Sequence, residues 1–188
     1  MGSLNDMRSI KKWLEDNVCP QVKLKVYRED TDLSKQADYV HPLVYENMIP
    51  EADFLKENEY NAPAIAIEFL KTKDDINDSS RIIDIRLCVL TYSHGLQPGD
   101  VLKKDVQYQR NYDGFQAYLN FIDIIMKEIE KAEEIGGFAL DRSVAIETGQ
   151  MTDEYGTIID YYPFFAGYVS FSIQRTLLTT TKVYDGLL

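Results

Sequence analysis

The chain has 188 residues, 45% of them hydrophobic, and 31 acidic against 20 basic side chains give a formal net charge of −11. This length suits one domain with a substantial core and is short for two. The acidic balance disfavours binding to a nucleic-acid backbone or to an anionic membrane surface. Cys19 and Cys88 match no disulfide or CxxC pattern, so we expect free thiols in a reducing compartment. We expect neither a signal peptide nor a membrane span, because no apolar run approaches about 18 residues.

The first predicted element is a short helix that begins at Ser3 and ends near Asn17. Ser3 with Asp6 three residues later is typical of a helix N-terminus. The apolar positions that share one face of this helix are Met7, Ile10, Trp13 and Leu14. Residues 21–29 then alternate between apolar and polar side chains, which predicts a half-exposed strand. Residues 30–61 are polar and irregular, and they predict a long loop, which in a compact domain is usually functional or mobile.

Two long strands are predicted at 63–70 and 81–92, and the polar connection KTKDDINDSS between them predicts a hairpin turn. In the second strand, one face is wholly apolar and is expected to pack on the helices: Ile83, Ile85, Leu87 and Val89. The other face mixes charged and apolar side chains: Ile82, Asp84, Arg86, Cys88, Leu90 and Tyr92. A mixed face of this kind favours a surface covered by another copy or by a partner.

A second irregular stretch, 93–112, leads into the longest helical pattern of the chain, 113–135. Seven apolar residues at spacings of three and four predict its buried face: Phe115, Tyr118, Leu119, Ile122, Ile125, Met126 and Ile129. Asp113 is the expected N-cap, and Gly136-Gly137 is expected to stop the helix.

A strand near 140–148, a turn around 153–156 and a last strand at 165–175 complete the pattern. In the last strand Val169, Phe171 and Ile173 alternate with Ser170, Ser172 and Gln174. The order α-β-β-β-α-β-β predicts an α+β fold, with a mainly antiparallel sheet of about five strands and two helices packed on one face. We expect a single domain over 1–175, followed by a C-terminal arm, 176–188, that orders on assembly.

Candidate catalytic and metal-binding residues are scattered rather than grouped. Glu68 and Lys71 are three apart on a strand, which predicts opposite faces and disfavours a nuclease. His94 follows a strand, but no nearby pattern identifies a serine or cysteine nucleophile, so a capping or hydrogen-bonding role is favoured. His41 has no second histidine or cysteine close by, and the acidic run 74–78 lacks the spacing of a calcium loop. We therefore expect no enzymatic activity and no cofactor.

The second half of the chain nevertheless has a recognisable order of segments. YDGFQAYLNFIDIIMKEIE, then GGFAL, then YYPFFAGYVSFSIQR resemble the tail-terminator and minor tail proteins of siphophages and related prophages. In that family a long helix is followed by a strand, and an aromatic-Pro-aromatic-aromatic-x-Gly segment leads into the last strand. Residues 162–169 fit that ending, and PAIAIEFL resembles the first half of the family, so the resemblance covers roughly residues 60–175.

The resemblance implies a non-enzymatic virion assembly protein of the virion tail, which occupies the host cytoplasm during assembly. Such proteins form rings, usually hexameric, that cap the tail tube protein and present a surface to the head connector or neck protein. DNA would pass through an acidic lumen without specific binding. The loops 30–61 and 93–112 would order against these partners, and the expected contact residues are Tyr108, Arg110, Tyr112, Tyr161 and Tyr162. Phe164 and Phe165 are expected to serve core packing.

Other functions remain open from sequence. The long 30–61 insertion and the C-terminal arm depart from the family pattern, which leaves another neck or tail-completion protein as the nearest alternative. A small hydrolase that uses His94, and a monomeric acidic adaptor, are the alternatives from other classes. The thirteen tyrosines suit either interfaces or extended β structure.

Overall fold

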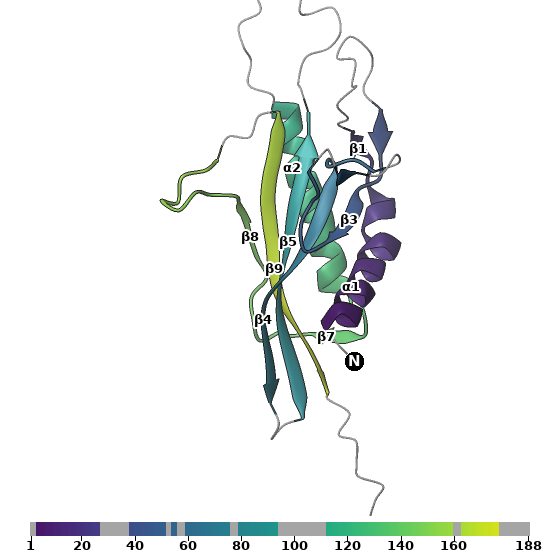
Figure 1. Ribbon diagram of the computed structural model, residues 1–188, viewed down its shortest axis with the longest axis vertical. Coiled ribbons are helices and arrows are strands. Elements are labelled where there is room, and N and C mark those ends of the chain that lie inside the picture. The colour runs from purple at the N-terminus through teal and green to yellow at the C-terminus, as the bar shows by residue number, and fades with distance from the viewer. Residues whose placement is uncertain are drawn as a thin grey trace, which may run out of the picture.

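The computed structural model describes residues 3–26, 38–51, 54–55, 59–75, 79–93, 112–159 and 163–176. Within these ranges two α-helices, α1 (Ser3–Asn17) and α2 (Tyr112–Lys131), pack on one face of a seven-stranded sheet (Figure 1). The predicted α+β class is confirmed. The core lies between the helices and the sheet, where Ile10 and Leu14 of α1 join Phe121 and Ile125 of α2.

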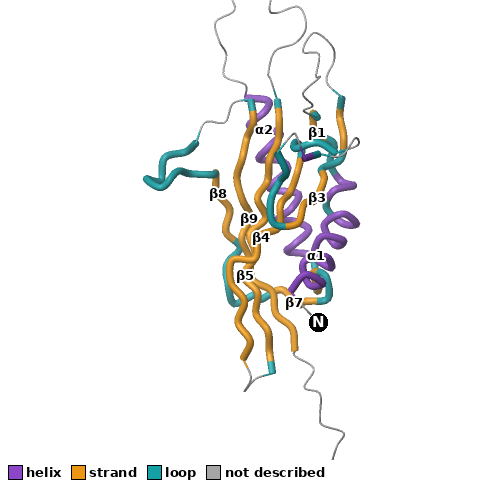
Figure 2. Tube along the Cα trace, in the orientation of Figure 1, coloured by secondary structure: helices purple, strands orange, loops and turns teal. Residues whose placement is uncertain are grey.

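The strands follow one another across the sheet in the order β3-β4-β5-β9-β7-β6, and β8 also pairs with β9 (Figure 2). Their bounds are β3 (Leu43–Glu46), β4 (Ala64–Asp75), β5 (Ser80–Tyr92), β6 (Glu134–Ile135), β7 (Phe138–Leu140), β8 (Glu147–Gln150) and β9 (Phe164–Thr176). All these pairs are antiparallel except β3 with β4, which is parallel. The sheet therefore has more strands than the five predicted, because several strands of two to four residues escape a periodicity test.

The N-terminal helix has the predicted bounds and the predicted buried face. Ile10 and Leu14 are fully buried, and Trp13 packs against the core from a partly buried position. The strand predicted at 21–29 begins later than expected, because Gln21 belongs to the 3-10 turn η1 (Cys19–Gln21). Within the described residues 21–26 the strand is β1 (Leu24–Lys25), which pairs with β2 (Tyr39–Val40) in a separate two-stranded sheet. Residues 27–29 of the prediction lie outside the described residues.

The predicted loop 30–61 and the predicted turn 71–80 are both partly wrong. Strand β3 lies inside the first, and it was missed because only four residues pair, between prolines and polar residues. In the second, β4 continues through Asp75 with a bulge between Phe69 and Lys71, so the hairpin is longer than the apolar pattern indicates.

Helix α2 ends at Lys131, four residues before the predicted end, because residues 134–140 form the β6–β7 hairpin. Gly136 and Gly137, with φ of +62° and +84°, are the two-residue turn of that hairpin rather than a helix stop. The buried face of α2 is also rotated from the prediction. Phe115 and Leu119 are 36% and 43% exposed, whereas Phe121, which the prediction left out, is fully buried.

The last third of the chain builds one edge of the sheet. The single strand predicted at 140–148 is instead two short strands, β7 and β8, which pair with opposite ends of β9. The segment between them turns at Asp141, whose carboxylate accepts a hydrogen bond from the Ser143 amide at 3.0 Å. Strand β9 confirms the predicted alternation: Val169, Phe171 and Ile173 are buried under the helices.

Candidate functional site

The aromatic segment at the start of β9 joins three elements that are distant in sequence. Phe164 contacts Tyr92 at the end of β5, with ring centroids 5.4 Å apart. Phe165 lies over Gly114 at the start of α2, where any Cβ would overlap the ring. The Pro163 carbonyl accepts a hydrogen bond from the Ser93 amide at 3.0 Å. Phe165 therefore packs against the core, as predicted, whereas Phe164 contacts Tyr92 outside the core cluster.

Gly167 and Tyr168 of the same segment contact the neighbouring strand β8 on both faces of the sheet. From the helix side, the Tyr118 hydroxyl donates a hydrogen bond to the Gly149 carbonyl at 3.2 Å. The Tyr118 side chain passes over Gly167, where a Cβ would overlap the Tyr118 hydroxyl, so only glycine fits at this position. Burial, with a smaller contribution from Tyr168, raises the pKa of Tyr118 above its ordinary value, so the hydroxyl stays a neutral donor.

From the opposite face, the Tyr168 ring covers Gly149 so closely that a Cβ there would lie 2.8 Å from the Tyr168 hydroxyl oxygen. The Arg86 guanidinium stacks on the same ring, 5.0 Å from its centroid. Gly149 is thus held between two tyrosines. We refer to Tyr118, Gly149, Gly167 and Tyr168 as the tyrosine clamp.

The tyrosine clamp holds the base of a projecting hairpin, residues 151–159, which we call the arm. The arm leaves the end of β8 and extends away from the sheet (Figure 1). Its tip is ordered by Asp153, whose carboxylate accepts hydrogen bonds from the amides of Tyr155 at 2.9 Å and Thr157 at 2.8 Å. Tyr155 is 84% exposed and Ile158 is 60% exposed. An ordered projection with an exposed aromatic tip is typical of a contact surface.

The helix-free face of the sheet is the mixed face predicted from β5. Asp84 accepts a hydrogen bond from Ser172 at 2.7 Å. The Arg86 Nε is buried and has no hydrogen-bond acceptor within the described part of the chain. Burial, with the nearby Glu68 carboxylate, raises the pKa of Cys88 to about 12, so its thiol stays protonated and a poor nucleophile.

The bulge in β4 overturns one prediction made from spacing. Glu68 pairs with Arg86 and Lys71 pairs with Asp84, so Glu68 and Lys71 lie on the same face of the sheet. The extra residue at the bulge resets the alternation of side chains. No group of three His, Cys, Asp or Glu side chains that could hold a metal ion occurs among the described residues.

Several predicted site residues lie outside the described residues: His94, Tyr108, Arg110, Tyr161 and Tyr162. Tyr112 is the first residue of α2, and only its backbone is described. The lone His41 has a structural environment, because its Nδ1 lies 2.9 Å from the carbonyl oxygens of both Cys19 and Val22. It joins η1 and the residue after it to the end of β2.

Sequence reasoning missed the tyrosine clamp and the exposed tip of the arm. One signal was present, since an isolated glycine in a strand indicates close approach of another group. Gly149 and Gly167 are such positions, but nothing local indicates that Tyr118 would reach a carbonyl 31 residues away.

The chain matches no protein-family model, and none of the curated proteins it was compared with is significantly similar. Among the helices that the structure describes, none is both long and apolar enough to span a membrane.

Proposed function

We propose that the protein is a non-enzymatic virion assembly subunit, a ring-forming tail terminator that caps the tail tube and joins it to the head connector. One observation carries the proposal. Gly167 and Tyr168, from the segment that resembles the tail-terminator family, build the tyrosine clamp and so fix a projecting arm with an exposed aromatic tip. The segment on which the resemblance rests and the arm, which is the candidate contact element, therefore form one structural unit.

The helix-free face of the sheet supports the same proposal. Its side chains are half-buried although neither α1 nor α2 covers them, and they include Ile82 and Leu90 beside Arg86. Such a face suits burial against a neighbouring subunit. The net charge of −11 suits a channel wall that DNA passes without binding.

The direct test is inactivation of the gene in the phage or prophage that encodes the protein, followed by electron microscopy of the induced lysate. The proposal predicts tail tubes of uncontrolled length that are not joined to heads, because nothing stops tube growth. Complementation with the wild-type gene should restore tails of uniform length. Infectious particles of normal appearance without the gene would contradict the proposal.

The same images separate the nearest alternative. A neck or other tail-completion protein predicts tails of normal length that fail to join heads. Complementation with His94→Ala addresses the hydrolase alternative, because a structural role for the protein predicts intact particles with this variant.

A further inference from the structure

We propose that the arm of one copy binds the outward face of helix α1 of a second copy. This inference rests on the proposed function, in that it assumes the chain assembles with itself, and it names the two surfaces that meet. The outward face of α1 is defined here by Leu4, Arg8, Lys11 and Lys12.

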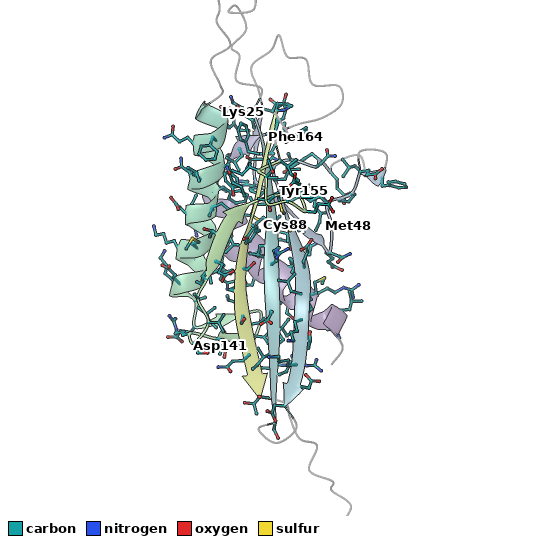
Figure 3. The ribbon with its side chains drawn as sticks, turned by 90° about the vertical axis from the view of Figure 1, so that its left-hand side faces the viewer. Lys25, Met48, Cys88, Asp141, Tyr155 and Phe164 are labelled. Atoms are coloured by element: carbon teal, nitrogen blue, oxygen red, sulfur yellow. The ribbon has the colours of Figure 1, made fainter. Side chains whose placement is uncertain are left out.

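The two surfaces lie on opposite sides of the molecule. The arm follows β8, which pairs with β9, and it extends away from the sheet, while α1 lies on the helix-covered face between the β6–β7 hairpin and β3, where Arg8 is 3.7 Å from Glu46 (Figure 1). In the view turned by 90°, Tyr155 is on the near side of the sheet and α1 is behind it (Figure 3). One chain therefore cannot bring its own arm onto its own α1. A contact between two different surfaces of identical chains is heterologous, and it generates a ring when the rotation closes.

The charges of the two surfaces are complementary. Residues 147–159 contain Glu147, Asp153 and Glu154 and no basic residue. The outward face of α1 instead carries Arg8 and Lys12, which are both exposed, in the N-terminal part of the helix. The exposed acids of α1, Glu15 and Asp16, follow in its last turn, where Glu15 pairs with Lys11 at 3.9 Å. The ion pair between Arg8 and Glu46 is long and exposed, so it contributes little in the free chain and a new carboxylate readily replaces it.

The apolar parts of the two surfaces also match. Leu4, one turn before Arg8, is 53% exposed, and the arm offers Tyr155 at 84% and Ile158 at 60% exposure. The Tyr155 ring can stack on the Arg8 guanidinium while Ile158 covers Leu4. Burying these side chains gives the contact an apolar centre with a charged rim, which is the usual anatomy of a protein interface.

Other occupants fit the arm less well. A symmetric contact between two arms would place Glu154 of each copy close to the same carboxylate of the other, and like charges in an interface are unfavourable. Nucleic acid would be repelled by the same carboxylates. The α1 helix of a second copy offers basic side chains to the carboxylates of the arm and an exposed leucine to its apolar tip.

The test uses two charge reversals in the full chain, Glu154→Lys on the arm and Lys12→Glu on α1. Each variant alone places like charges on both surfaces, so we expect assembly, measured by mass photometry at low salt, to need at least about tenfold higher protein concentration. An equimolar mixture of the two variants should restore assembly, because the reversed arm of one meets the reversed helix of the other. Asp123→Lys, the same reversal at an exposed position of α2, is the matched control and should assemble like the wild type.

The outcomes distinguish this inference from the function on which it rests. If the wild type assembles and each single variant assembles equally well, the arm–α1 contact is wrong while the proposed function stands. A mixture that stays as dissociated as its two components would also overturn it. A wild-type chain that stays monomeric at every concentration, with tail tubes present, would overturn the proposed ring as well. Tyr155→Ser keeps all charges and removes an apolar contact. We expect it to weaken assembly at low salt and equally at high salt.

Discussion

At the scale of single residues, one buried carboxylate joins the N-terminal helix to the ends of two strands. Asp6 is 2% exposed, and its oxygens lie 3.0 Å from Arg175 Nη1 and 3.3 Å from Arg81 Nη1. Arg81 also pairs with Asp74 at 2.6 Å, which lowers the pKa of Asp74 below its usual range. The helical pattern of α1 did not predict this, because the two arginines approach Asp6 only in the folded sheet.

Replacement of Asp6 by Asn should therefore be strongly destabilising. The change leaves Arg175 facing a neutral amide, while Arg81 keeps its pair with Asp74. Loss of one partner of a buried ion pair costs about 3–5 kcal/mol. Urea denaturation measures the free energy of unfolding. Asp16→Asn, at an exposed position of the same helix, is the control and should change it by less than about 0.5 kcal/mol. Equal effects at the two positions would show that the Asp6 network does not stabilise the fold.

The tyrosine clamp gives a second prediction at this scale. Gly167→Ala places a methyl group where the Tyr118 hydroxyl and the Gly149 carbonyl lie, so we expect a loss of about 1–3 kcal/mol and release of the arm. Limited proteolysis should then cut within 151–159 faster than in the wild type. Ser170→Ala, on the other face of β9, serves as control. Unchanged cleavage at the arm in Gly167→Ala would mean that the clamp does not hold it.

The two cysteine thiols are expected to make the free energy of unfolding fall with rising pH in the alkaline range. Burial raises the pKa of Cys19, and burial with Glu68 raises that of Cys88, in each case from 9.0 to about 12. A raised pKa in the folded state means that the unfolded chain releases its protons first. Their contribution is therefore complete below about pH 9 and is lost as pH rises towards 12. We expect the urea midpoint of the wild type to fall faster between pH 9 and 11 than that of a Cys19→Ala, Cys88→Ala variant, and parallel curves would exclude this cause.

At the scale of elements, long periodic segments were predictable and short paired ones were not. Helix α1, strand β5 and strand β9 follow their apolar periods closely, because each buries one whole face. The parallel strand β3 and the bulge in β4 are set by which strands pair, and that is decided by contacts distant in sequence. For the same reason the glycines of the candidate site were visible in sequence while the tyrosine that reaches between them was not.

The glycine pair Gly136-Gly137 was predicted to end helix α2 and instead forms the turn of the β6–β7 hairpin. The packing of this turn gives a further prediction. Gly136 takes a φ of +62°, and a Cβ there would lie 2.7 Å from the Ser9 backbone of α1. Gly136→Ala should therefore strain the turn and push the hairpin from α1, which lowers the thermal midpoint by several degrees. Gly137→Ala has a positive φ but open space around it, so it separates the backbone cost from the clash. A Gly136 variant no less stable than the Gly137 variant would show that the close approach is unimportant.

At the scale of the whole molecule, the acidic arm and the outward face of α1 lie on opposite sides of the molecule, with the sheet between them (Figures 1 and 3). A contact between these two different surfaces would repeat from subunit to subunit around a closed ring, whereas a two-fold symmetric dimer would use the same surface on both copies. The overall negative charge would then line a passage that leaves DNA unbound. The proposed function requires a closed ring, because an open chain of subunits could not terminate a tube.

Native mass spectrometry of the protein bound to isolated tail-tube ends tests this most directly. From the proposed function we expect a single closed species with a fixed number of subunits, six by resemblance to the tail-terminator family, and no larger multiples. A monomer at every concentration, or an open series of masses without a limit, would contradict it.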